Sequence, residues 1–163
     1  MRNGKTIARF GLLIALALVL SYLESLLPLS FGVPGIKLGL PNLVVIFALY
    51  RLSPRSAAVI SLIRVLLSAV LFGSVLSLTY SAAGAVLSFL VMWGMQRSGK
   101  FGETGVSVAG AVAHNAGQIL TAMLVLETGR LAWYLPVLCL SGTAAGICIG
   151  LLSAVLVRRI KIN

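Results

Sequence analysis

The segment AVAHNAGQIL (111–120) places His114, Asn115 and Gln118, three hydrogen-bonding side chains, in an otherwise apolar stretch of the chain. Small or polar residues recur there at steps of three and four, which puts His114 and Gln118 on one helical face and Asn115 about 100° around it. Such side chains can hold a polar ligand, or they can only link neighbouring helices, a role worth about 0.6 kcal/mol per hydrogen bond on average. The pattern favours the ligand site, and the purely structural role stays open.

A single arginine, Arg64, lies within the apolar stretch AVISLIRVLLSAVLF, ten residues beyond Pro54. Ten helical residues rise about 15 Å, which reaches the middle of a hydrocarbon core about 30 Å thick. Because arginine stays charged, placing it there costs at least ~2.5–3.5 kcal/mol unless it faces a wet or protein-lined interior. His114 lies ten residues beyond the start of its own segment at Thr104, so we expect both side chains at one depth.

A cavity between these two helices would carry one permanent positive charge among several hydrogen-bonding groups. Such a site favours an anionic or strongly polar small molecule, for example a vitamin or a quinone or prenyl precursor. The predicted substrate-binding residues are Arg64, His114, Asn115, Gln118, Asn42 and Lys37.

The residue types that several kinds of catalysis need are missing. The acidic residues are Glu24, Glu103 and Glu127, and the chain contains no aspartate, whereas prenyl diphosphate synthesis needs aspartate clusters that hold Mg²⁺. His114 is the only histidine, so no metal site is expected. The stretch GMQRSGKF (94–101) has the spacing of a phosphate-binding loop but lacks its final serine or threonine. We therefore expect neither an enzyme nor a bound cofactor.

The composition shows which solvent surrounds these helices. Of the 163 residues, 60% are hydrophobic and only 10% are charged, and the mean hydropathy is +1.09. A soluble domain has about 25% charged residues, so this chain needs lipid around it. The net charge of +10 does not indicate nucleic-acid binding, because the basic residues lie between apolar segments. We predict a single transmembrane domain, 1–163.

Six apolar segments predict an all-α integral membrane protein with six transmembrane helices in one compact bundle. Five of them are long enough to cross the hydrocarbon core at about 1.5 Å per residue. The second is short and carries Pro41 near its start, so we expect a short or broken helix that lines a cavity. The segments are 7–29, 38–52, 54–73, 77–97, 104–127 and 132–157.

The distribution of basic residues predicts the orientation in the membrane. With both termini in the cytosol, ten lysine and arginine residues fall on the cytosolic side, and only Lys37 and Arg130 fall outside. Cytosolic loops of membrane proteins carry such an excess of positive charge. We expect a multi-pass protein of the bacterial cytoplasmic membrane.

Small residues recur every four positions in several segments, and the longest run comprises Gly142, Gly146, Gly150 and Ala154. Such stripes let helix backbones approach closely in lipid. Packing inside the bundle is the favoured interpretation of each stripe. An interface with another subunit is the alternative, mainly for the first segment.

Three stretches carry a resemblance to a known family. KLGLPNLVVIFALY (37–50), the arginine-bearing third segment and GAVAHNAGQILTA (110–122) resemble the Gx transporter family, which also bears the name heptaprenyl diphosphate synthase component I. The resemblance covers nearly the whole chain. In length and number of spans, the chain is also similar to the substrate-binding S components of energy-coupling-factor (ECF) vitamin transporters.

The resemblance implies a protein that captures a small molecule from outside and docks on a membrane scaffold subunit driven by two cytosolic ATPases. S components often dock through an Ala-xxx-Ala pattern on the first helix, to which Gly11 and Ala15 are the nearest match here. The predicted function is that of a substrate-binding membrane subunit for uptake. The alternative is a non-catalytic membrane accessory subunit of a polyprenyl (heptaprenyl) diphosphate synthase.

Overall fold

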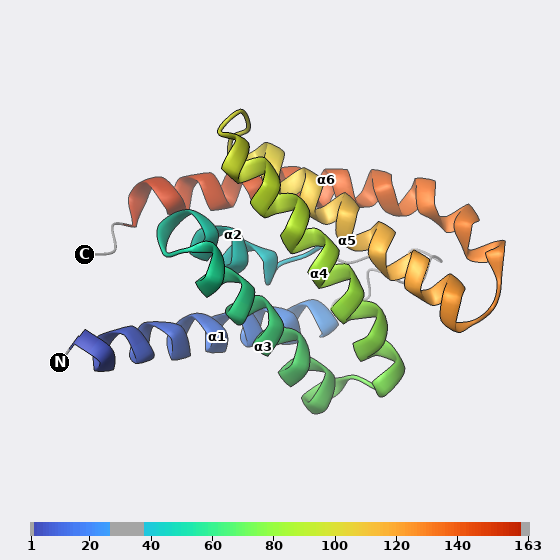
Figure 1. The fold of residues 1–163 in the computed structure, drawn as a ribbon, viewed down its shortest axis with the longest axis horizontal. Coiled ribbons are helices and arrows are strands. Elements are labelled where there is room, and N and C mark those ends of the chain that lie inside the picture. Colours follow the sequence, from blue (N-terminus) through green and yellow to red (C-terminus); the bar gives the residue numbers. More distant parts are fainter. Residues whose placement is uncertain (1, 27–37, 161–163) are drawn as a thin grey trace.

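The computed structural model describes residues 2–26 and 38–160, and its described residues form helices packed side by side (Figure 1). The expected all-α bundle of six helices is confirmed, with a short 3₁₀ helix (η1) before the last one. The elements are α1 (Arg2–Leu26), α2 (Asn42–Arg51), α3 (Pro54–Phe72), α4 (Val75–Ser98), α5 (Glu103–Val125), η1 (Gly129–Tyr134) and α6 (Leu135–Arg159).

Five helices are long and apolar enough to cross a membrane, as expected, and α2 is the short one. With 10 residues, α2 is about 15 Å long, half of what a span needs. Its side chains from Val44 to Leu49 are all buried, so it lies inside the bundle and not against lipid. Of the short or broken second helix that was predicted, the short form is confirmed.

Local signals place the ends of α3 and α4. Ser53 and Ser74 cap their N-termini, and each hydroxyl accepts a hydrogen bond of 3.1 Å from the backbone N–H three residues later. At the other end of α4, Gly99 adopts the left-handed conformation (φ 67°) that ends many helices. The stretch 94–101 is thus the end of a helix, which agrees with the rejection of a phosphate-binding loop.

Helices α4, α5 and α6 pack closely because glycines face one another across their contacts. A Cβ on Gly117 would lie 3.0 Å from the Cα of Gly84, and one on Gly146 would lie 2.7 Å from the Cα of Val108. Gly142 and Gly150 approach α5 in the same way. The small-residue stripe of α6 therefore serves packing within the bundle.

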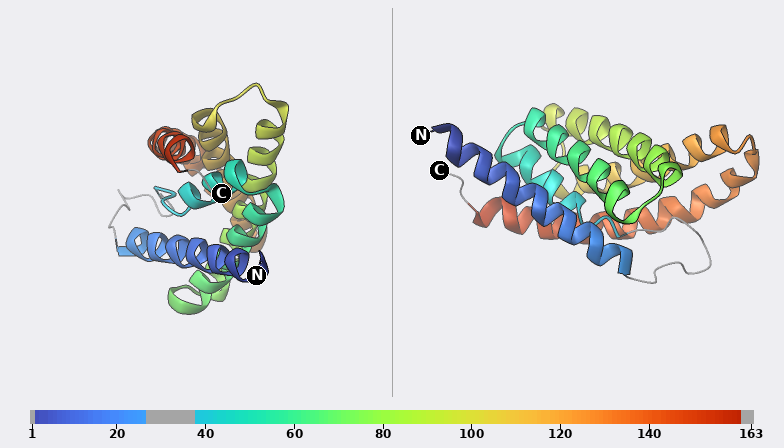
Figure 2. Two further views of the ribbon diagram at one scale, coloured as in Figure 1. Left: turned by 90° about the vertical axis from the view of Figure 1, so that its left-hand side faces the viewer. Right: turned by 90° about the horizontal axis from the view of Figure 1, so that it is seen from below.

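The helices alternate in direction, which gives the bundle two distinct ends (Figures 1 and 2). The start of α1, the α2–α3 and α4–α5 connections and the end of α6 lie toward one end, on the left in Figure 1. The α3–α4 and α5–α6 connections lie toward the other. The predicted cytosolic arginines of the described residues occur at the first end, and Arg130 occurs at the second.

Candidate functional site

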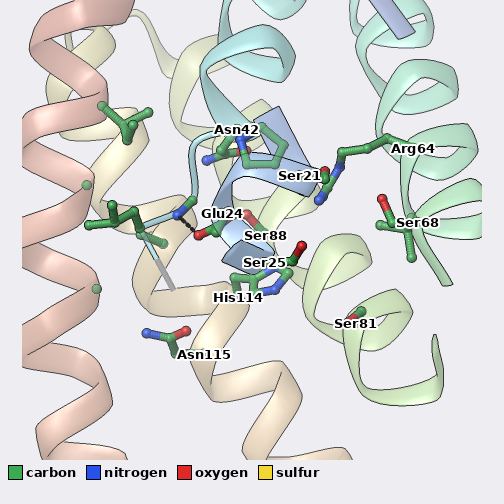
Figure 3. A pocket seen from close by; sticks show the side chains of 18 of the residues that line it. Ser21, Glu24, Ser25, Asn42, Arg64, Ser68, Ser81, Ser88, His114 and Asn115 are labelled. Carbon is green, nitrogen blue, oxygen red and sulfur yellow. Dashed lines mark hydrogen bonds between the residues drawn. The ribbon is translucent and has the colours of Figure 1, made fainter. Parts of the chain in front are cut away.

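A cavity of about 340 Å³ lies within the bundle, and all six α-helices contribute side chains to it (Figure 3). Twelve of its lining residues are polar or charged, an unusual wall for the interior of a membrane protein. These are Ser21, Glu24, Ser25, Asn42, Arg64, Ser68, Ser77, Ser81, Ser88, Ser107, His114 and Asn115.

The exposure of the lining residues indicates where the cavity opens. Ser25, Gly73 and Ser77 are exposed, and they lie where α1 ends, α3 ends and α4 begins. Ser88 and Ser107 are buried, at 4% and 0% exposure, and lie further along α4 and near the start of α5. The cavity therefore opens at the bundle end opposite to the basic end and runs inward from there. The charge distribution predicts that the end with this opening faces the outside of the membrane.

Arg64 projects from α3 into this space, and Figure 3 shows its guanidinium directed toward Ser21 of α1. Its Nε is buried and has no hydrogen-bond partner among the described residues. The carboxylate of Glu24 is close enough to attract the guanidinium electrostatically. Arg64 thus lies in a protein-lined interior, as the cost of placing a charge in lipid requires.

Two buried hydroxyls of the cavity wall are also left without partners. The Oγ atoms of Ser68 and Ser107 make no hydrogen bond within the described part of the chain. Buried polar groups in proteins are almost always paired, with protein, water or a ligand. Unpaired groups on the wall of a cavity therefore point to something polar that binds there.

Glu24 connects α1 to the segment that leads into α2. Its Oε1 accepts a hydrogen bond of 2.6 Å from the backbone N–H of Gly39, whose φ of 71° suits a glycine. Leu38, Gly39 and Pro41 line the cavity beside it. The carboxylate therefore holds one wall of the cavity in place.

Glu24→Ala is expected to lower the free energy of unfolding by about 1.5–3 kcal/mol, because a hydrogen bond to a charged group is lost. Glu24→Gln keeps the acceptor oxygen and should lose less. Thermal unfolding in detergent micelles measures both. Ser25→Ala is the neighbouring control, since the Ser25 hydroxyl bonds only the Tyr22 carbonyl of its own helix. Equal losses in Glu24→Ala and Ser25→Ala would contradict this prediction.

Asn115 joins α5 to α6. Its Nδ2 donates a hydrogen bond of 2.6 Å to the carbonyl oxygen of Leu138, and the amide lies against Gly142, where a Cβ would come within 2.7 Å. The side chain is buried, at 6% exposure, and lies at the edge of the cavity (Figure 3). Its donor atom is already used, so Asn115 positions α6 next to His114.

Asn115→Leu is expected to cost roughly 0.6–1.7 kcal/mol of stability, the range for interhelical hydrogen bonds in membrane proteins. The isosteric change Thr143→Val is the control, because the Thr143 hydroxyl bonds only the carbonyl of Cys139 in its own helix. Denaturant-induced unfolding of the two variants and the wild type gives the comparison. A Thr143→Val protein as unstable as Asn115→Leu would refute the interhelical role.

The structure brings four predicted site residues together: Arg64, His114, Asn115 and Asn42 all line the cavity. Asn42 also directs its Nδ2 at the sulfur of Met92, 3.6 Å away. Gln118 does not line the cavity and instead lies against α4, where its Cγ would be 2.8 Å from a Cβ on Gly84.

Of the remaining three predicted residues, only the two predicted docking residues can be placed. Lys37 is outside the described residues. Gly11 and Ala15 lie on an exposed face of α1, and a Cβ on Gly11 would have no atom within 4 Å. This face is open, unlike the small-residue stripe of α6.

The predicted set omits Glu24 and all seven serines that line the cavity. Ser21, Glu24 and Ser25 share one face of α1, because they are spaced by three and four residues. Ser77, Ser81 and Ser88 repeat at similar steps on α4. These polar stripes in apolar segments are the signal that would have identified them.

Comparison with known proteins completes the description of the site. No curated protein and no solved structure matches this sequence. The model of the family described as heptaprenyl diphosphate synthase component I matches residues 13–156. This match spans all the described cavity residues and nearly the whole bundle, and the chain therefore belongs to the heptaprenyl diphosphate synthase component I family.

Proposed function

We propose that this protein is a substrate-binding membrane subunit that takes up a small, polar or anionic molecule from the outer side of the membrane. The observation that carries the proposal is Arg64, whose buried Nε lacks a partner among the described residues while it lines the cavity. An unpaired buried charged donor costs more than about 1–3 kcal/mol. A site that keeps an unpaired charged donor is suited to a ligand that carries a hydrogen-bond acceptor.

The other groups that line the cavity support binding and not only helix packing. His114 and Asn42 reach the same space from α5 and α2, and the hydroxyls of Ser68 and Ser107 lack partners in the described structure. Polar side chains that merely join helices would be expected to bond one another, as Asn115 bonds Leu138. Arg64, His114 and Asn42 are the proposed ligand-contacting residues, with Asn115 positioning α6 and Glu24 holding the wall.

The proposal assigns energy supply to partner proteins. Helix α1 contributes an open face with Gly11 and Ala15, where another membrane helix could approach closely. An ECF-type transmembrane scaffold with cytosolic ATPase subunits is the partner that fits the resemblance. The chain itself would neither hydrolyse ATP nor catalyse a reaction.

The test is to purify the full-length protein in mild detergent and to identify its bound small molecules by mass spectrometry. The wild type is expected to retain a polar compound that Arg64→Ala does not retain. A wild-type protein without a bound small molecule, in cells where Arg64→Ala leaves uptake normal, would overturn the proposal.

The family description favours a second function, a non-catalytic accessory subunit of a heptaprenyl diphosphate synthase. The chain lacks aspartate, so Mg²⁺-dependent chemistry would belong to a soluble partner. Co-purification with an aspartate-rich partner, and a gain in that partner's synthase activity, would support this function. The cavity favours uptake, because about 340 Å³ is too small for a long prenyl chain.

A further inference from the structure

The charges that line the cavity limit the charge of its ligand. Among the described lining residues, Arg64 is the one arginine or lysine and Glu24 the one acid, and the two attract each other. The formal charges of these two groups cancel. A diphosphate with two or three negative charges would meet one cation and a nearby carboxylate, and dry surroundings make such an imbalance costly. Because the pair is already neutral, a ligand with a single carboxylate adds the smallest imbalance of any anion, and Arg64 is the one cation among the described lining residues that can bind it.

The wall offers many hydroxyl groups. Seven serines line the cavity, from α1, α3, α4 and α5. Ser107 is 0% exposed, and its Oγ has no partner within the described residues. A serine hydroxyl can both donate and accept a hydrogen bond. A wall of serines therefore matches a ligand that also both donates and accepts at several points, as a chain of hydroxyl groups does.

The size and shape of the cavity also restrict which ligands fit. Its volume of about 340 Å³ is at the lower end of the range of about 300–1,000 Å³ for small-molecule sites. At ~30 Å³ per water-sized unit it holds roughly eleven non-hydrogen atoms, and its open end leaves room for a few more. Among the described lining residues the imidazole of His114 is the one aromatic ring, and no phenylalanine, tyrosine or tryptophan offers a larger stacking surface. A compact, non-aromatic molecule fits these walls best.

We propose that the substrate class of this cavity is the small hydroxy acids, non-aromatic molecules with one carboxylate and several hydroxyl groups. The carboxylate binds the Arg64 guanidinium, including its unpaired Nε, and the hydroxyls bond the serines and His114. This inference rests on the proposed uptake function and narrows it to one class. It predicts that prenyl diphosphates and aromatic vitamins bind this site more weakly than hydroxy acids do.

The experiment measures the binding of defined probes to the full-length protein in lipid nanodiscs by equilibrium dialysis. Gluconate and its stereoisomer galactonate represent the proposed class. Hexanoate has the same number of carbons without the hydroxyls, sorbitol has the hydroxyls without the charge, and isopentenyl diphosphate represents the diphosphates. At least one of the two hydroxy acids is expected to bind tenfold or more tightly than hexanoate, sorbitol and isopentenyl diphosphate.

Two variants link the binding to the cavity wall. Ser107→Ala should weaken hydroxy-acid binding severalfold and leave hexanoate binding unchanged, because only the hydroxyl contact is lost. Ser74→Ala is the control, since Ser74 caps α4 and does not line the cavity. Equal or tighter binding of hexanoate or isopentenyl diphosphate, or no binding of either hydroxy acid, overturns the inference. If the purified protein nevertheless carries another small molecule that Arg64→Ala loses, the uptake function stands without it.

Discussion

Replacing Arg64 with methionine is expected to abolish ligand binding while the protein stays as stable as the wild type or becomes more stable. Hydrogen bonds to a charged group contribute about 1.5–3 kcal/mol, so the loss of affinity should be at least tenfold. Methionine has a similar length and leaves no large hole. Because the guanidinium Nε has no partner among the described residues, its removal relieves the cost of a buried charge. This gain offsets the lost attraction to Glu24, whose carboxylate keeps its hydrogen bond from the Gly39 N–H.

The combination of lost binding and kept stability separates a ligand site from a structural arginine. Replacing an arginine that has only a structural role would lower the free energy of unfolding by several kcal/mol, since its partners would be left unpaired. Arg130→Met is the control, because Arg130 is exposed on η1 at the far end of the bundle. Mass spectrometry of the bound small molecules and thermal unfolding provide the two measurements. Unchanged binding in Arg64→Met would contradict the prediction, and so would an unfolding temperature clearly below those of the wild type and Arg130→Met.

Gly146→Ala is expected to destabilise the bundle by about 1–3 kcal/mol, the usual cost of adding atoms to a packed interior. The new Cβ would lie 2.7 Å from the Cα of Val108 and 3.2 Å from the carbonyl oxygen of Ser107. These are backbone atoms, so a side-chain rotation cannot relieve the clash. Helices α5 and α6 would have to separate, which would also displace Ser107 from the cavity wall.

Gly94→Ala is the matched control for Gly146→Ala. Gly94 lies within α4, is exposed, and would place its Cβ at more than 4 Å from any neighbouring atom. Alanine there should be neutral or should stabilise by up to ~1 kcal/mol, because it has the better helix propensity. Thermal unfolding of both variants in the same detergent gives the comparison. A stable Gly146→Ala protein would show that the contact between α5 and α6 is looser than described.

The sequence predicted the conspicuous polar residues of the cavity wall. Arg64 and His114 stand out because charged and polar groups are rare in apolar segments, and the rise per helical residue places both near one depth. The structure brings them to the same cavity. Gln118 follows the same pattern but packs against Gly84, because the crossing of α4 and α5 covers that turn of the helix.

The rest of the cavity wall, its serines and Glu24, depends on how the helices cross. Serines are common in membrane helices, and their spacing alone does not say which neighbour each will face. Glu24 lies near the end of a span, where a carboxylate in water would also be acceptable. Its contact with Gly39 exists only because α1 packs beside the segment that leads into α2.

The sequence by itself determined that this is a helical membrane protein with a short second helix, because hydrophobic length, proline position and charge distribution are local properties. It also indicated that Arg64 must avoid lipid, since no protein environment neutralises an arginine easily. Only the tertiary structure decided which polar faces meet. Those contacts follow from glycine-mediated approaches between α4, α5 and α6 and from the burial of α2, which depend on residues far apart in the chain.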